Sequence, residues 1–148
     1  MRVIVSLIYL QMVVLTSTPA AYAQEGELDN NTRLALANFV AEMVECSVYY
    51  AINGQLQDGF GNQWKMGKDY QKLSENMGLA AFALAKTIKM KTETLTAMAE
   101  SDAREMGQSI DQDAINIRIL SNKYGIFCKN LVENPEERMR YWVEKETM

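Results

Sequence analysis

The residues best suited to chemistry in this sequence are carboxylates, because the sequence contains no histidine. Without imidazole, the Ser-His-Asp and Cys-His arrangements, the H-E-x-x-H zinc site, the C-x-x-C-H haem attachment and the Glu-x-x-His di-iron ligands are all removed. General acid or base work near neutral pH would then need a carboxylate, lysine or tyrosine with a shifted pKa. The sequence therefore argues against most hydrolases and metalloenzymes.

Two groups of acids are candidates for a carboxylate pair. Glu42 and Glu45 lie three residues apart, and Glu100, Asp102 and Glu105 cluster farther on. A glycan hydrolase needs two carboxyl groups across a cleft, which makes a secreted carboxylate-dependent hydrolase one alternative. Ordinary solvated acids satisfy the same pattern, since Asp and Glu are rarely buried without partners. We therefore favour solvated helix faces and lean towards a protein that is not an enzyme.

Metal-binding patterns are weaker still. The segment Asp58–Asp69 combines acids with glycines, but the calcium-loop spacing fails at Phe60 and at Gln63, which stands where the pattern requires glycine. Methionines of an exported protein can hold copper(I). Several of them, however, fall at expected core positions, where methionine is a flexible gap filler: Met43, Met77, Met98 and Met106. We expect neither a metal site nor a cofactor.

Three aromatic residues are the candidate binding surface. Phe60 and Trp64 stand among glycines and amides between two expected helices, and Tyr49 lies beside the apolar face of the first helix. Aromatic side chains on loops form recognition surfaces for proteins and small ligands. The alternative is that they fold back and close one end of the protein, because aromatic burial is strongly favourable. We take Tyr49, Phe60 and Trp64 as a possible binding surface.

The elements that position these residues follow an N-terminal export signal. Arg2 precedes the apolar run Val3–Leu15, which is shorter than the roughly 20 apolar residues that span a bilayer. Ala21-Tyr22-Ala23 then suits a signal peptidase. We expect residues 1–23 to be a cleaved signal peptide and residues 24–148 a single helical domain, periplasmic or secreted. An uncleaved membrane anchor is the alternative.

Both cysteines, Cys46 and Cys128, remain after this cleavage. Disulfides persist in the compartments that exported chains reach, and no C-x-x-C redox spacing is present. We therefore expect one structural disulfide between them, with two free buried thiols or pairing between chains as alternatives. Closing so long a loop would stabilise the fold by roughly 4 kcal/mol on the chain-entropy model.

Apolar residues recurring every three or four positions predict helices, and no segment has the alternation of a strand. The expected elements are a helix from Asn31 or Thr32 to Asn53 ended by Gly54, a loop over Gly54–Lys65, a helical pattern over 70–110, a helix capped by Ser109 or Asp111 that continues to Leu131, and a short helix opened by Asn134-Pro135-Glu136-Glu137. Residues 70–110 form either two helices or one rod. We prefer a break near Lys91, because a rod would be long for this domain.

These segments predict an all-α protein, an antiparallel helical bundle of about four helices plus a short C-terminal helix, with one disulfide. The disulfide would pin the first helix against the fourth. On the first helix we expect one core face and one water-facing side that carries Asn38, Glu42 and Glu45. The expected core positions are Phe39, Met43, Cys46, Tyr50, Tyr70, Leu73, Met77, Ala81, Leu84, Ile88, Leu95, Met98, Met106, Ile110, Ile117, Leu120, Tyr124, Phe127, Cys128, Leu131, Met139, Trp142 and Val143.

The charge balance narrows the expected partners. The formal net charge is −4, with no basic stripe for a phosphate backbone and no polybasic patch for a membrane. We therefore expect an exported non-catalytic accessory or protein-binding module that contacts another exported or envelope protein, with no nucleic acid and no transmembrane segment after cleavage. A hydrophobic small-ligand carrier is a further alternative to the glycan hydrolase. An exposed apolar patch would favour the module, and an enclosed cavity of several hundred Å³ the carrier.

Overall fold

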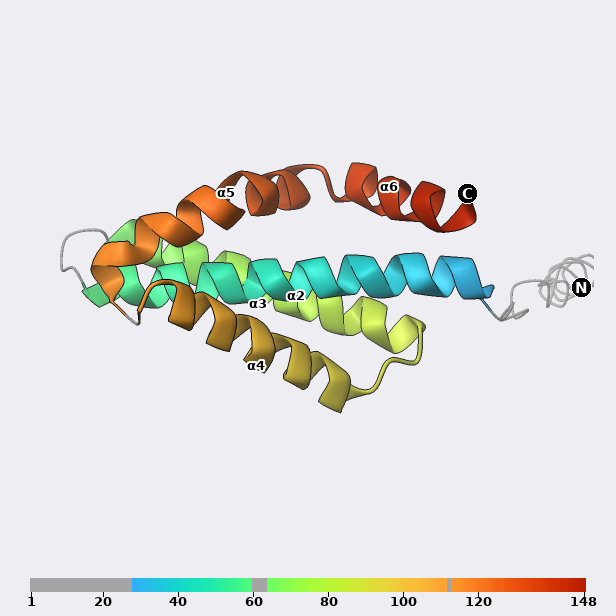
Figure 1. The fold of residues 1–148 in the computed structure, drawn as a ribbon, viewed down its shortest axis with the longest axis horizontal. Helices are drawn as coiled ribbons and strands as arrows, with labels where there is room; N and C mark the ends of the chain where they lie inside the picture. Colours follow the sequence, from blue (N-terminus) through green and yellow to red (C-terminus); the bar gives the residue numbers. More distant parts are fainter. Residues whose placement is uncertain (1–27, 60–63, 112) are drawn as a thin grey trace, which may run out of the picture.

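The computed structural model describes residues 28–59, 64–111 and 113–148, and these form a bundle of helices without strands. The elements are α2 (Asn30–Gly59), α3 (Trp64–Thr87), α4 (Thr92–Ser109), the 3₁₀ turn η1 (Ala114–Asn116), α5 (Ile117–Glu133) and α6 (Pro135–Thr147). α2 runs antiparallel to α3, α5 and α6 and parallel to α4 (Figure 1). The predicted all-α bundle is confirmed, whereas the expected signal peptide lies outside the described residues.

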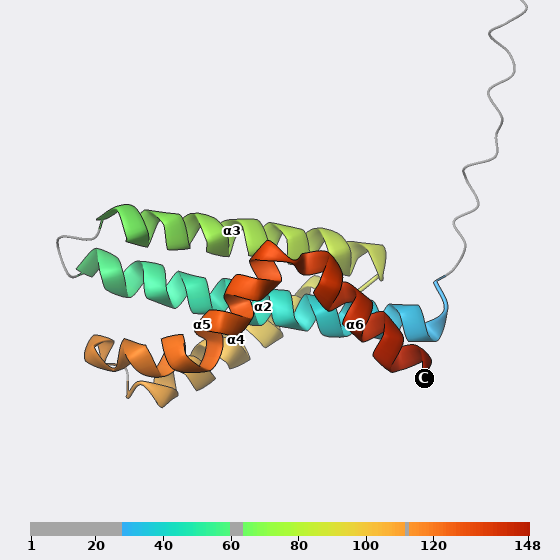
Figure 2. The same cartoon turned by 90° about the horizontal axis from the view of Figure 1, so that it is seen from above.

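α2 is the central helix and contacts α3, α4, α5 and α6. Figure 2 shows α6 lying across it. The expectation that one side of α2 faces water is therefore wrong: Glu42 forms an ion pair with Arg138 of α6, and the Asn38 amide donates a hydrogen bond of 3.1 Å to Glu146. A helix covered on several sides needs no single apolar stripe, so polar residues on its second side meet partners instead of solvent.

Both ends of α2 differ from the sequence expectation. Asp29 caps the helix, since its Oδ1 accepts the Thr32 backbone N–H at 2.9 Å. The helix also passes Gly54 and ends at Gly59. A Cβ on Gly54 would come within 2.9 Å of Gln71 Cγ and 3.1 Å of the Gly67 carbonyl oxygen. Glycine is needed at position 54 because α3 approaches α2 closely there. Gly54 therefore serves close packing and does not end the helix.

The expected break between α3 and α4 is confirmed. Lys89 has φ 57°, the left-handed conformation that ends a helix. Its N–H donates to the Lys86 carbonyl at 3.1 Å, and the Met90 N–H donates to the Ala85 carbonyl at 2.9 Å. This pair of hydrogen bonds is a Schellman motif, which satisfies carbonyls at the end of α3 and lets the chain turn back into α4.

The start of α5 differs from the sequence expectation, whereas the start of α6 agrees with it. Neither Ser109 nor Asp111 caps α5; Asp113 accepts the Ile115 N–H at 2.9 Å and opens η1, from which α5 continues. The predicted start of the last helix is confirmed, with Pro135 in the first turn of α6 followed by two acids. Proline lacks the N–H that a continued helix would need, so α5 and α6 are separate helices.

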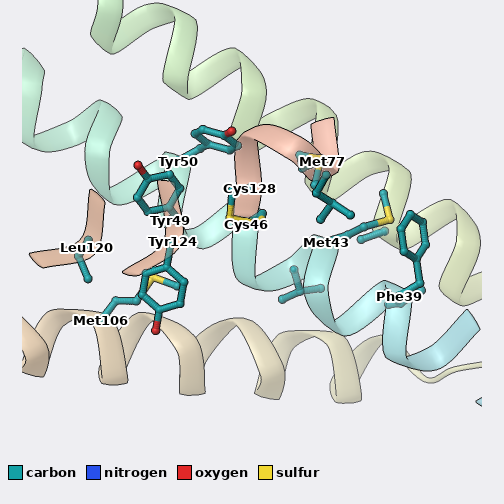
Figure 3. Close-up of a cluster of buried hydrophobic side chains, with 14 of the residues drawn as sticks. Phe39, Met43, Cys46, Tyr49, Tyr50, Met77, Met106, Leu120, Tyr124 and Cys128 are labelled. Atoms are coloured by element: carbon teal, nitrogen blue, oxygen red, sulfur yellow. A yellow bond between two sulfur atoms is a disulfide. The ribbon is translucent and has the colours of Figure 1, made fainter. Parts of the chain in front are cut away.

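The core is centred on the predicted disulfide. Cys46 and Cys128 are fully buried and bonded, with Cα atoms 5.3 Å apart. Figure 3 shows the bond among aromatic, methionine and leucine side chains from α2, α3, α4 and α5. The following expected core residues are buried: Phe39, Met43, Cys46, Tyr50, Met77, Ala81, Ile88, Met106, Ile110, Leu120, Tyr124, Cys128 and Leu131. In the described part of the chain, no helix combines the length and hydropathy that crossing a bilayer requires.

Candidate functional site

A hollow of about 370 Å³ lies where α5 meets α6, and we call it the junction hollow. α5 ends as the Asn134 N–H donates to the Asn130 carbonyl at 2.8 Å, and Pro135 then starts α6 in a new direction (Figure 2). The resulting bend brings side chains of both helices around one concave space. The hollow is lined by Phe127, Asn130, Leu131, Asn134, Glu137, Arg138 and Tyr141.

Arg138 anchors one wall of the junction hollow. Its Nε donates to Glu42 Oε2 at 2.8 Å, and its Nη2 donates to Glu42 Oε1, so both guanidinium bonds go to one carboxylate. These bonds raise the pKa of Arg138 above its usual range. Its guanidinium carbon lies 4.2 Å from the ring centre of Tyr141 and 5.4 Å from that of Phe127. The ion pair therefore neutralises the charge of Arg138 and fixes the plane of its guanidinium group, beside which the rings of Tyr141 and Phe127 lie.

The rest of the lining offers uncharged and acidic groups to solvent. Tyr141 is 44% exposed. Asn130 and Asn134 are one helical turn apart and exposed, and Glu137 adds an exposed carboxylate. Amide side chains both donate and accept hydrogen bonds, as a peptide backbone does. The chemistry of the hollow suits an extended peptide segment with an apolar or cationic side chain, which an aromatic face and a carboxylate both favour.

The two candidate carboxylates on α2, Glu42 and Glu45, contact two different neighbouring helices. Glu42 is taken up by Arg138 of α6, whereas Glu45 faces α4. Burial raises the pKa of Glu45, and the charge of Asp102 raises it further. Burial also raises the pKa of Asp102, with Glu105 adding to the effect. Glu42 and Glu45 therefore serve separate contacts, and no pair of catalytic carboxylates on one face results from them.

Glu105, the third acid of this group, meets a cation. It accepts a hydrogen bond from Lys123 of α5 at 2.8 Å, which lowers the pKa of the Glu105 carboxyl. Glu45, Asp102 and Glu105 do not line the junction hollow, nor two further hollows, one between α2 and α6 and one between α3 and α4. The arrangement links α2, α4 and α5 electrostatically.

Metal-ligand candidates are dispersed. Asp58 lies in the last turn of α2 and Asp69 in α3, with residues 60–63 between them outside the described ranges. Met43, Met77 and Met106 are buried in the core (Figure 3). Across 28–59, 64–111 and 113–148, no group of three or more Cys, Asp or Glu side chains is placed to hold a metal ion.

The expectation that Tyr49 contributes to a binding surface needs correction. Tyr49 is only 4% exposed, and its ring lies 5.1 Å from that of Tyr50 and 6.1 Å from that of Tyr124. Burial raises the pKa of Tyr49, as expected for a core phenol. Phe60 lies outside the described residues, and Trp64 begins α3 with its side chain outside them. A surface built on Phe60 and Trp64 stays a prediction, without Tyr49.

Sequence reasoning missed the residues of the junction hollow. Two signals were available: the Asn134-Pro135 break, which forces a bend, and Tyr141, an aromatic residue outside the apolar positions of its helix. The pairing of Arg138 with Glu42 joins residues far apart in the chain, so no local pattern reveals it.

Comparison with known proteins gives no family for this chain and no function for the junction hollow. No protein-family model matches the chain, no curated protein is significantly similar to it in sequence, and no solved structure matches its fold significantly. The function must therefore be inferred from the surface itself.

Proposed function

We propose that this chain is an exported, non-catalytic protein-binding module, and that its junction hollow receives a short segment of another exported or envelope protein. The observation that carries the proposal is the lining of the hollow. An exposed tyrosine and two exposed amides surround a space of about 370 Å³ beside a guanidinium whose charge is already neutralised. Such a space is at the lower end of the size of ligand pockets, enough for one or two side chains.

The shape and chemistry of the hollow favour a peptide over an enclosed lipophilic ligand. Asn130, Asn134, Glu137 and Tyr141 are all exposed, so the space opens to solvent. A carrier of a hydrophobic small molecule would instead surround its ligand with apolar groups. The carboxylate of Glu137 and the net charge of −4 favour a basic segment in the partner. The glycan-hydrolase alternative is less favoured, because Glu42 is engaged by Arg138.

Export is part of the same proposal. The Cys46–Cys128 disulfide is compatible with an oxidising compartment, where such bonds persist. Cleavage after Ala23 remains an expectation from the sequence pattern. Mass spectrometry of the protein recovered from the periplasm or medium would test it: a chain that begins at Gln24 supports export, and an intact Met1 start recovered from the cytosol contradicts it.

Panning a phage-displayed library of short random peptides against the purified, disulfide-bonded protein tests the hollow. Peptides that bind should lose about tenfold or more in affinity for Tyr141→Ala, because exposed tyrosines at a contact centre are frequent hot spots. Asn130→Ala should weaken them less, through the loss of a hydrogen bond with a peptide backbone.

Phe82→Ala is the matched control, since Phe82 on α3 is 49% exposed, close to the exposure of Tyr141. Binding should be unchanged in this variant. Peptides that bind Tyr141→Ala as tightly as the unmodified protein, or a library that yields no binder, would contradict the junction hollow as the binding site.

A further inference from the structure

The outer side of α5 carries a second apolar face. Ile115, Ile119 and Ile126 are 77%, 46% and 77% exposed, and we call them the isoleucine stripe. They are four and seven residues apart, which places them along one side of η1 and α5. The core side of the same helix holds Leu120 and Tyr124, both buried. α5 is therefore apolar on two opposite sides, although only one of them is covered.

A single exposed isoleucine needs no explanation, but an aligned set does. Ile115, Ile119, Asn122 and Ile126 follow the spacing of four, three and four residues that forms the seam of paired helices. Such a seam is stable when a second helix with the same spacing packs against it. A second copy of this chain supplies that helix without requiring any other partner.

Charges at the two ends of the isoleucine stripe decide the orientation. Asp113 lies at its start and Lys129 beyond its end, and both are exposed. In an antiparallel pair with Ile115 opposite Ile126 of the other copy, Asp113 of each copy lies near Lys129 of the other. A parallel pair would instead place Lys129 beside Lys129. Lys129 forms a 2.9 Å ion pair with Glu133 in one chain, and such exposed pairs cost little to exchange.

We infer that two copies of this chain associate through their isoleucine stripes, with the two α5 helices antiparallel. The pairing buries three isoleucines per copy and brings opposite charges together at both ends of the contact. It uses none of the residues that line the junction hollow, so it does not depend on the proposed peptide binding. The antiparallel arrangement places the two junction hollows at opposite ends of the paired helices, which would give a bivalent module.

Sedimentation equilibrium of the disulfide-bonded protein, from micromolar to submillimolar concentrations, tests the pairing. The expected result is a monomer–dimer equilibrium whose dissociation constant rises more than about tenfold in Ile126→Glu, because the variant buries a charge in the contact. Circular dichroism should show unchanged helix content, since Ile126 does not contact the core side. Leu79→Glu is the matched control, because Leu79 on α3 is 70% exposed, and its dissociation constant should be unchanged.

A second measurement tests orientation. Chains with Ile115→Cys mixed with chains with Ile126→Cys should form an intermolecular disulfide, whereas chains with Ile115→Cys alone should not. Cross-linking of Ile115→Cys with itself would contradict the antiparallel arrangement. A protein that stays monomeric throughout the concentration range, or association abolished by Leu79→Glu and not by Ile126→Glu, would overturn the inference.

Discussion

The disulfide-bonded middle of the bundle and the C-terminal helix α6 are both packed on α2, but by different forces. In the middle, Cys46, Cys128, Leu120 and Met106 are almost fully removed from solvent. α6 has no fully buried residue. It is held by the Arg138–Glu42 ion pair, by the Asn38–Glu146 hydrogen bond, and by partly buried Met139 and Trp142. The first region rests on apolar burial and a covalent bond, the second on a few partly polar contacts.

This difference determines how each region should respond to perturbation. Few buried apolar contacts allow a segment to open locally while the rest of the fold persists. The Trp142 indole N–H is buried with no hydrogen-bond partner in the described part of the chain, which further weakens the attachment of α6. The junction hollow lies at the boundary of the two regions, with one wall on α5 next to the disulfide and the other on α6.

The largest effect should follow removal of the disulfide. We expect Cys46→Ala with Cys128→Ala to lower the free energy of unfolding by about 4 kcal/mol, because the bond restricts the unfolded chain over a long loop. Chemical denaturation with urea measures the change. A loss below about 1 kcal/mol would contradict the view that this bond dominates the stability of the middle region.

Breaking the main contact of α6 should have a smaller and more local effect. Arg138→Met keeps much of the side chain over the rings but leaves Glu42 unpaired at 13% side-chain exposure. We expect a loss of about 1.5 kcal/mol, between the values for surface and buried pairs. Amide hydrogen exchange should accelerate in α6 and stay slow in the middle of α2. Equal acceleration in both helices would show that the two regions unfold as one unit.

Lys129→Met is the matched control for this comparison. It removes the Lys129–Glu133 pair, whose side chains are 66% and 52% exposed. We expect a change below about 0.5 kcal/mol, since exposed pairs gain little over hydrated charges.

The smallest expected effect concerns the pH dependence of the middle region. Burial, and then the charge of Asp102, raise the pKa of Glu45, so the folded state holds this proton more tightly than the unfolded state does. Glu45 therefore favours folding most below its unfolded pKa, and this contribution is lost as pH rises through its folded pKa. Glu45→Gln should increase stability at pH 7 by about 0.5 kcal/mol or less, because solvent screens a half-exposed group.

Urea denaturation at pH 7 and at pH 4 measures this effect, and the advantage of Glu45→Gln should shrink at the lower pH. Glu105→Gln is the opposite case, since the hydrogen bond from Lys123 lowers the pKa of Glu105. That variant should be less stable than the unmodified protein at neutral pH. Stability of Glu45→Gln that is equal to or below that of the unmodified protein at pH 7 would contradict the cost of burying this carboxylate.

Local signals predicted much of the fold and little of the site. Helical spacing, the break near Lys91 and the Asn134-Pro135 start all depend on neighbours in the chain, and each is confirmed. The end of α2 was misplaced because glycine has two uses that look alike in sequence. Gly54 serves close packing against α3 and not helix termination, and only the position of α3 distinguishes the two.

The sequence by itself indicated the helical segments and the all-α class, and it favoured a bond between Cys46 and Cys128, because spacing and an even cysteine number limit these choices. It misplaced the end of α2 and the start of α5. Tertiary structure decided which side of α2 meets α6, that Tyr49 is a core residue, and that Arg138 and Glu42 meet beside a hollow. These outcomes depend on which helices lie beside one another and at what angle. Such angles arise from packing among distant residues, which no local pattern in the sequence records.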